Sequence, residues 1–331
     1  MSLASDHALE TPGSSAPEQS EIAGRSLTQI AWGRLRRDKV AMFSMAFVLL
    51  VILIAIFAPL ITKVVGVDPL EFNPKAIDDA GGLPAGRWGG ISLEHPLGVE
   101  PGTGRDLFAR LLYGSRISLL IAFSGTFITL TIGVTIGIIA GYSRGWLDTT
   151  LGRVMDLVLA FPLLLILLAM SSVLTQRLEA TFGLEPNVAR VLYIILVLSF
   201  FAWPYLARII RGQVLSLRER EFVESAVSMG AGTPRILFKE ILPNLWAPIL
   251  VYATLLLPTF IAAEAALSYL GVGLLPPTPS WGAMLSESVS YFTVMPGYLF
   301  IPGTYLFLVV LSFNLLGDAV RDALDPRAGR V

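Results

Sequence analysis

The stretch that decides the fold is Val40–Thr62, VAMFSMAFVLLVILIAIFAPLIT, which contains no charged side chain. A helix that crosses the hydrocarbon core of a membrane needs about 20 predominantly apolar residues. The stretch is long enough to cross, and its residues do not alternate between apolar and polar as they would in a membrane strand. It therefore predicts a membrane-spanning helix.

Five further runs of the same kind follow along the chain. The run that starts at Val191 is short, and it reaches the length of a span by including Arg190 or Arg208, whose long side chains can extend to the membrane surface. The five runs are Ile117–Tyr142, Leu157–Gln176, Val191–Ala207, Ile241–Ala263 with a continuation to Leu270, and Tyr298–Gly317. The predicted fold class is an all-α integral membrane protein with six transmembrane helices.

The composition agrees with this fold and excludes several classes of function. Only 15% of the residues are charged, whereas about a quarter are charged in soluble domains, so much of the surface faces something other than water. The net charge of −1 argues against a nucleic-acid partner. The absence of cysteine excludes disulfides, thiolate catalysis and cysteine-ligated metals. His7 and His95 lie on either side of the first apolar run, which argues against a histidine metal site.

The Lys and Arg residues indicate the orientation in the membrane. If the N-terminus is cytoplasmic, 16 of the 24 basic residues lie in cytoplasmic segments and 8 in external ones. Cytoplasmic segments of membrane proteins carry the excess of basic residues, and the cluster Arg34–Lys39 stands directly before the first span. We therefore expect both termini to be cytoplasmic.

The spans divide the chain into five predicted regions. The first is a disordered cytoplasmic tail, because its composition is rich in Ser, Pro, Ala and Glu without an apolar period. The regions are the tail at 1–34, the first transmembrane helix at 35–63, an external loop at 64–114, a five-helix core at 115–318 and a cytoplasmic C-terminus at 319–331. In the external loop, apolar residues at 107, 108, 111 and 112 predict a short amphipathic helix on the outer surface. That helix could pack against the bundle or contact an external partner.

The cytoplasmic segment 208–243 has the pattern of a helix, a break and a second helix. A helix from about 219 to 229 would place Phe222, Ala226 and Met229 on one face. Gly230 can end this helix, because glycine accepts the left-handed conformation of a C-terminal cap. A structured polar hairpin with small residues predicts a docking element for another protein.

The second half of this hairpin has its own start and stop. Thr233 can cap the next helix, with Pro234 at its first position. Pro243 marks the turn into the fifth span.

Several blocks of the chain together resemble one family. Glu224-Ser225-Ala226, then Gly230 and later Leu242-Pro243, resemble the EAA loop of ABC-importer permeases, although Ser225 replaces the first alanine and Glu240 an isoleucine. The chain is similar to the C-type subunit of the dipeptide, oligopeptide and nickel permeases over about 35–327, and residues 66–93 look like an insertion. The further matching blocks are HPLG at 95–98, GRD at 104–106, LYGSRISL at 112–119, RGQV at 211–214, EAALSYLG at 264–271, PPTPSWG at 276–282, NLLGD at 314–318 and RDALDP at 321–326.

The resemblance implies a type I ABC importer permease in a bacterial cell membrane, with no catalytic residue, metal or cofactor of its own. Its expected partners are a second homologous permease subunit, one or two cytoplasmic ATPases that bind ATP and Mg²⁺, an external substrate-binding protein and membrane lipid. The expected cargo is a dipeptide or oligopeptide. Residues 221–231 would form the helix that couples to the ATPase. The expected coupling residues are Glu221, Phe222, Glu224, Ser225, Ala226, Met229, Gly230, Leu242 and Pro243.

Polar residues in or near the spans are weaker candidates. A charge in the centre of a span is costly, so such a residue usually faces the interior of the bundle. Asp156, Glu264 and Asn314 are therefore candidates for pore-lining or gating groups, with structural pairing as the alternative. Arg105 and Asp106 are candidates for contact with an external partner.

Three other interpretations remain open at this point. The same machinery could import nickel, haem, glutathione or another small solute. A secondary transporter would need coupling-ion carboxylates at the middle of the membrane and two related halves. An intramembrane enzyme would need a nucleophile with its base, a metal set or paired carboxylates. The sequence shows no such acidic cluster, internal repeat or catalytic set within the spans.

Overall fold

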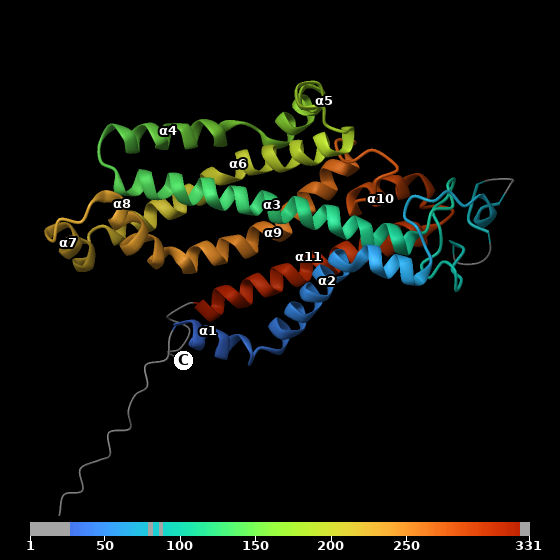
Figure 1. The fold of residues 1–331 in the computed structure, drawn as a ribbon, viewed down its shortest axis with the longest axis horizontal. Helices are drawn as coiled ribbons and strands as arrows, with labels where there is room; N and C mark the ends of the chain where they lie inside the picture. The colour runs from blue at the N-terminus through green and yellow to red at the C-terminus, as the bar shows by residue number, and fades with distance from the viewer. Residues whose placement is uncertain (1–26, 79–81, 86–88, 325–331) are drawn as a thin grey trace, which may run out of the picture.

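The protein is a bundle of long helices in the computed structural model, which describes residues 27–78, 82–85 and 89–324 (Figure 1). Among these described residues, six helical segments are long and apolar enough to cross a membrane, which confirms the predicted fold class. They are Lys39–Val65 (α2), Leu107–Tyr142 (α3), Leu163–Phe182 (α5), Pro186–Leu217 (α6), Thr233–Tyr269, which ends in α9 (Trp246–Tyr269), and Pro296–Leu324 (α11).

Helices α3 and α6 form the centre of the bundle, where small residues let their backbones approach closely. Gly133, Gly137 and Gly141 recur every fourth residue on the side of α3 that faces α6. A Cβ atom on Gly137 would lie 2.7 Å from the carbonyl oxygen of Ala207. Membrane helices gain van der Waals contact through small residues at their interfaces, so these glycines hold the two longest described helices together.

The predicted third span, Leu157–Gln176, is wrong as a single helix. Helix α4 (Trp146–Ala160) ends just before Phe161, whose backbone is extended, with φ −81° and ψ 133°. Proline disfavours the helical conformation in the residue before it, and Pro162 follows Phe161 directly. The chain therefore starts again as α5, which alone has the length of a span.

The short amphipathic helix predicted on the outer surface does not exist as a separate element. Helix α3 begins at Leu107 and continues without interruption to Tyr142. The predicted helical spacing of the apolar residues is confirmed, since Leu107, Leu111 and Leu112 lie on one face and are buried. They face the bundle rather than the membrane surface, so the boundary predicted at residue 114 falls inside a helix.

The segment between α2 and α3 folds over one end of the bundle. It contains a short 3₁₀ turn, η1 (Pro74–Ala76), and two isolated antiparallel bridges, Ile77 with Pro84 and Val99 with Asp106. At the same end, α10 (Trp281–Ser288) and η5 (Val289–Tyr291) connect α9 to α11 (Figure 1).

The opposite end of the bundle carries the predicted docking hairpin (Figure 1). It consists of α7 (Glu221–Ser228), α8 (Thr233–Arg235), a π turn η3 (Ile236–Ile241) and a 3₁₀ turn η4 (Leu242–Leu245) that leads into α9. The hairpin and the loop between α2 and α3 therefore lie at opposite ends of the spans.

The N-terminal region differs from its prediction. Residues 27–35 form helix α1 (Leu27–Leu35), so a disordered tail to residue 34 is wrong for its last part. The guanidinium of Arg34 donates to the carbonyl of Ala323 near the end of α11, at 3.5 Å. This contact places α1 beside the end of α11. The first part of the predicted tail, 1–26, lies outside the described residues.

Candidate functional site

Helix α7 is anchored to the bundle by two small apolar side chains. Val223 and Ala226 are 2% and 4% exposed, and Val223 belongs to a cluster with Ile236, Ile241 and other apolar residues of α3, α6 and the hairpin. A spacing of three residues puts both on the same face of the helix. The buried face of α7 therefore attaches this helix to the bundle.

The outward face of α7 carries most of the residues predicted to couple. Phe222 is 39% exposed and Met229 is 79% exposed, and Glu221, Glu224 and Ser225 are exposed as well. The predicted grouping of Ala226 with Phe222 and Met229 on one face is wrong, because Ala226 is buried while the other two are exposed. An apolar pair surrounded by carboxylates and small residues is left open to contact from outside.

Gly230 ends α7 in the conformation expected of it. Its φ is +79°, its N–H donates to the carbonyl of Val227 at 2.9 Å, and the N–H of Ala231 donates to the carbonyl of Ala226 at 3.0 Å. Such bonds close the end of a helix through a left-handed residue. The next helix is capped by Gly232 and not by Thr233, which is already its first residue.

The second half of the hairpin leads back to the spans through the irregular turns η3 and η4. Leu242 is partly buried and Pro243 is exposed in η4. Asn244 donates from Nδ2 to the carbonyl of Glu240 at 2.6 Å, which satisfies one backbone group of the π turn. Leu242 and Pro243 thus lie at the base of the hairpin, close to the first turn of α9.

A hollow of about 610 Å³ opens beside α7, between it and the end of α3. Tyr142, Arg144, Arg218 and Glu224 contribute to its walls. Arg218 donates from Nη1 to the carbonyl of Gly141 at 3.0 Å, so its charge is held in place. Among the described residues Glu224 has no ion-pair partner, so its carboxylate is available to a group from outside the chain.

Glu264 is a structural residue in this chain and does not line an open pore. Its side chain is 0% exposed and accepts three hydrogen bonds of 2.8 Å, from the hydroxyls of Ser118, Ser268 and Ser280. These serines come from α3, α9 and the start of α10. The carboxylate therefore joins three elements, and the gating role predicted from sequence is not supported by its position.

Asp156 and Asn314 stay predictions as pore or gate residues, and both are exposed on this chain. Asp156 is on α4 and pairs with Arg208 of α6, while Asp148 on the same helix binds Arg211 of α6 with two hydrogen bonds, at 2.6 and 2.8 Å. These pairs attach α4 to α6. Asn314 is exposed on α11 and donates from Nδ2 to the carbonyl of Val310 in its own helix, at 2.9 Å.

Asp106 is too deeply buried to contact an external partner in this chain. It is 3% exposed, accepts from the N–H of Ala109 at 2.7 Å as the cap of α3, and lies 2.9 Å from Nδ1 of His95. Arg105 is more accessible, with 16% of its side chain exposed, and lies 3.7 Å from Glu100. The predicted contact is therefore wrong for Asp106 and stays a prediction for Arg105.

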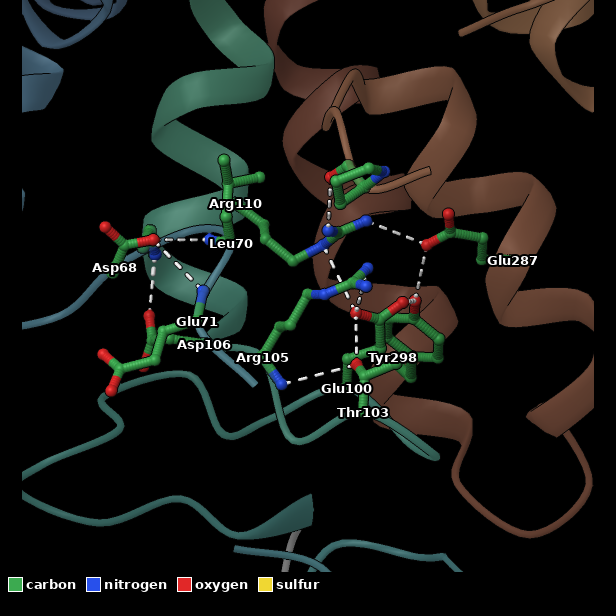
Figure 2. Close-up of polar contacts among 12 residues, drawn as sticks. Asp68, Leu70, Glu71, Glu100, Thr103, Arg105, Asp106, Arg110, Glu287 and Tyr298 are labelled. Carbon is green, nitrogen blue, oxygen red and sulfur yellow. Dashed lines mark hydrogen bonds and ion pairs between the residues drawn. The ribbon is translucent and has the colours of Figure 1, made fainter. Parts of the chain in front are cut away.

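Sequence reasoning missed a buried ion network at this end of the bundle, shown in Figure 2. Arg110 is 0% exposed. Its Nη2 donates to Glu287 at 2.9 Å, its Nη1 to the carbonyl of Pro277 at 3.0 Å, and its Nε lies 3.6 Å from Glu100. The hydroxyl of Tyr298 donates to Glu100 at 3.0 Å and lies 3.2 Å from Glu287. The sequence signal for this network was Arg110, a single arginine among apolar residues at helical spacing.

The two carboxylates of the network have opposite pKa shifts. Burial, a hydrogen bond with Glu100 and the charge of Glu100 raise the pKa of Glu287 to about 7, against the opposing effect of Arg110. For Glu100, burial raises the pKa, but Arg110 and hydrogen bonds from Glu287, Thr103 and Tyr298 outweigh it and hold the pKa below its usual value. Below about pH 7 Glu287 therefore holds a proton while Glu100 is ionised.

Comparison with known proteins assigns the chain to a family. Residues 133–330 match the family of binding-protein-dependent transport system inner membrane components, and residues 26–79 match the N-terminal transmembrane domain of oligopeptide transport permease C. The chain belongs to this family of importer permeases. It is therefore a multi-pass protein of the bacterial cell membrane, and the matched region includes α7 and its hairpin.

Two relatives and one solved structure illustrate the relationship. The chain is 37% identical over 328 residues to the dipeptide transport system permease protein DppC of Alkalihalophilus pseudofirmus, covering 98% of this chain and 99% of that one. It is 38% identical over 296 residues to the glutathione transport system permease protein GsiD of Escherichia coli, covering 89% of each. A chain of the inward-facing MetNI methionine ABC transporter has the same fold, with a TM-score of 0.50 at 20% identity over 65% of this permease.

Proposed function

We propose that this permease forms half of the translocation pathway of an ATP-driven importer of dipeptides and short oligopeptides. The observation that supports this proposal is the 37% identity of the chain, over nearly its whole length, to a permease named for dipeptide transport. A second permease subunit, cytoplasmic ATPases that hold ATP and Mg²⁺, and an external binding protein would complete the machine. The permease itself would be non-catalytic.

We propose further that the outward face of α7 docks on the ATPase. The face offers the exposed Phe222 and Met229 and the unpaired Glu224 beside the 610 Å³ hollow. Its other side is packed against the spans through Val223 and Ala226. A rigid helix of this kind transmits closure of a partner as a rigid-body movement and biases two arrangements of the bundle.

Glutathione is the second candidate cargo, because a permease named for glutathione transport is 38% identical over 89% of this chain. The two cargoes are chemically close, since both contain peptide bonds, an amino group and carboxylates. Reconstitution of the permease with its partner permease, ATPases and binding protein in proteoliposomes decides between them. ATP-dependent uptake of labelled dialanine supports the first proposal, uptake of labelled glutathione alone supports the second, and uptake of neither contradicts both.

Docking through α7 is tested in the same proteoliposomes with Gly230→Val and Glu224→Lys. A side chain at Gly230 meets no heavy atom of this chain within 4 Å, so Gly230→Val costs about 1 kcal/mol of backbone strain and leaves the fold intact. Both variants should lower ATPase co-purification or uncouple ATP hydrolysis from uptake. The control is Asp322→Lys, an exposed charge reversal on α11. Unchanged co-purification and uptake in both α7 variants would refute the docking role.

A further inference from the structure

A second hollow, of about 270 Å³, lies within the spans, between the start of α5, the middle of α6 and the middle of α9. Its walls are mainly apolar and include Leu163, Ala202 and Ala263. They also carry three hydroxyl groups, on Tyr205, Tyr252 and Thr259, and no charged side chain. The hydroxyl groups distinguish this hollow from its surroundings.

The two tyrosine hydroxyls make no hydrogen bond to another described residue. Tyr205 is 58% exposed and Tyr252 is partly buried, and in the part of the chain that the structure describes neither hydroxyl makes a hydrogen bond. Thr259, near the middle of α9, donates to the carbonyl of Leu255 at 2.8 Å and is otherwise exposed. A polar group without a partner is costly in hydrocarbon, so this face is suited to water or a polar solute rather than to lipid.

Other exposed surfaces of the spans have the opposite character. The exposed large side chains of α2, such as Phe43, Leu53 and Ile56, are apolar. A hollow of about 470 Å³ between α3, α5 and α6 is lined by apolar residues and by Ser199, whose hydroxyl donates within the bundle, to the carbonyl of Ile195 at 2.6 Å. The large exposed side chains of these surfaces are apolar and Ser199 is paired, as a lipid-facing surface requires.

Two prolines beside the hollow can allow helices α6 and α9 to bend there. Pro204 directly precedes Tyr205 in α6, and Pro258 directly precedes Thr259 in α9, both within the helix. A proline removes one hydrogen bond of the helical ladder, and sharp bends in helices occur at such positions. The walls of the hollow can therefore change their separation without breaking further backbone bonds.

We propose that the hollow at Tyr205, Tyr252 and Thr259 is this chain's wall of the translocation pathway. Its hydroxyls would exchange hydrogen bonds with water and with the peptide groups of the passing solute, and its apolar part would contact side chains. Because no charge lines it, it holds neither end of a peptide tightly, which suits a path for solutes of varied sequence. The inference rests on the proposed importer function.

Cysteine accessibility tests this wall directly, since the chain has no native cysteine. The variants are Tyr205→Cys and Thr259→Cys, with Ile56→Cys on the apolar face of α2 as the matched control. Each is assembled into the full transporter in proteoliposomes and treated with a cationic, membrane-impermeant methanethiosulfonate. Only a thiolate in contact with water reacts, so both pathway cysteines should react at least about tenfold faster than the control.

Protection of the cysteines from modification by bound cargo distinguishes failure of this proposal from failure of the proposed importer function. Dialanine with binding protein should slow modification of Thr259→Cys and leave the control unchanged. If glutathione and not dialanine slows modification of Thr259→Cys, the hollow is still part of the translocation pathway, but the cargo is glutathione. Modification of both pathway cysteines as slow as that of Ile56→Cys, in a transporter that imports dipeptide, would overturn the wall and leave the importer function standing.

A bulky substitution gives an independent readout. Thr259→Trp would fill the hollow and should lower dipeptide uptake at least about tenfold, as expected when a pathway is closed sterically, while Ile56→Trp should leave uptake unchanged. Equal uptake by both variants at equal membrane abundance would contradict the proposal.

Discussion

Glu287 Oε2 lies 2.9 Å from Nη2 of Arg110, which joins α10 to the first turns of α3 across 177 residues of sequence. Arg110 is fully buried and Glu287 is 23% exposed at its side chain. Glu100, from the loop before α3, approaches the same guanidinium. The pair therefore fixes the position of the loop and of α10 relative to the spans, and its protonation affects both.

The loop and α10 should be more stable at pH 5 than at pH 7.5. The pKa of Glu287 is about 7 in the folded protein, above the usual value of 4.5 for a glutamate, so between these two pH values the folded state binds more protons than the unfolded state. Stability then falls as the pH rises through that window, by at most about 3 kcal/mol. Thermal unfolding of the purified protein in detergent at both pH values measures it. Glu287→Gln should remove the difference, and an unchanged pH dependence in that variant would contradict the assignment.

Glu264→Ala should destabilise the bundle strongly. The substitution leaves the hydroxyls of Ser118, Ser268 and Ser280 without their buried acceptor, at a cost of about 2–5 kcal/mol in all. Detergent-solubilised variants would be compared by thermal unfolding. The control is Glu224→Ala, an exposed carboxylate whose removal should change stability by less than about 0.5 kcal/mol. Similar unfolding temperatures for the two variants would show that the carboxylate does not join these elements.

Gly137→Ala should separate α3 from α6. A Cβ atom there would lie 2.7 Å from the backbone oxygen of Ala207 and from Cβ of Ile210, so the helices must move apart, at a cost of about 1–3 kcal/mol. Gly152→Ala is the matched control, because Gly152 is also within a helix and has open space around it. It should be neutral or stabilising by up to about 1 kcal/mol. Thermal unfolding in detergent measures both variants. Equal unfolding temperatures for Gly137→Ala and Gly152→Ala would contradict the close contact of α3 with α6 at Gly137.

The orientation predicted from basic residues is tested with single cysteines at the two ends of the bundle. Leu93→Cys lies in the loop before α3, where Leu93 is 100% exposed, and Ser228→Cys lies at the end of α7. In intact cells an impermeant maleimide should label Leu93→Cys only, and Ser228→Cys should react after permeabilisation. Labelling of Ser228→Cys alone in intact cells would reverse the orientation.

The sequence by itself determined the number and approximate position of the spans. Solvation in a membrane depends on length and polarity alone, so Val40–Thr62 predicted α2 (Lys39–Val65) closely. Local conformational rules also held, since Gly230 ends α7 in the left-handed conformation. The family resemblance followed from the order of short blocks, which also needs no tertiary information.

Only the tertiary structure decided which polar residues are buried and what they join. Arg110 and Glu264 are distant in sequence from most of their partners, and an ion pair or hydrogen bond of this kind depends on positions that local patterns do not specify. The same holds for Asp106, which the fold turns inward to cap α3 and meet His95. The hollow at Tyr205, Tyr252 and Thr259 likewise exists only because α6 and α9 meet side by side, which brings three hydroxyls from two helices to one surface.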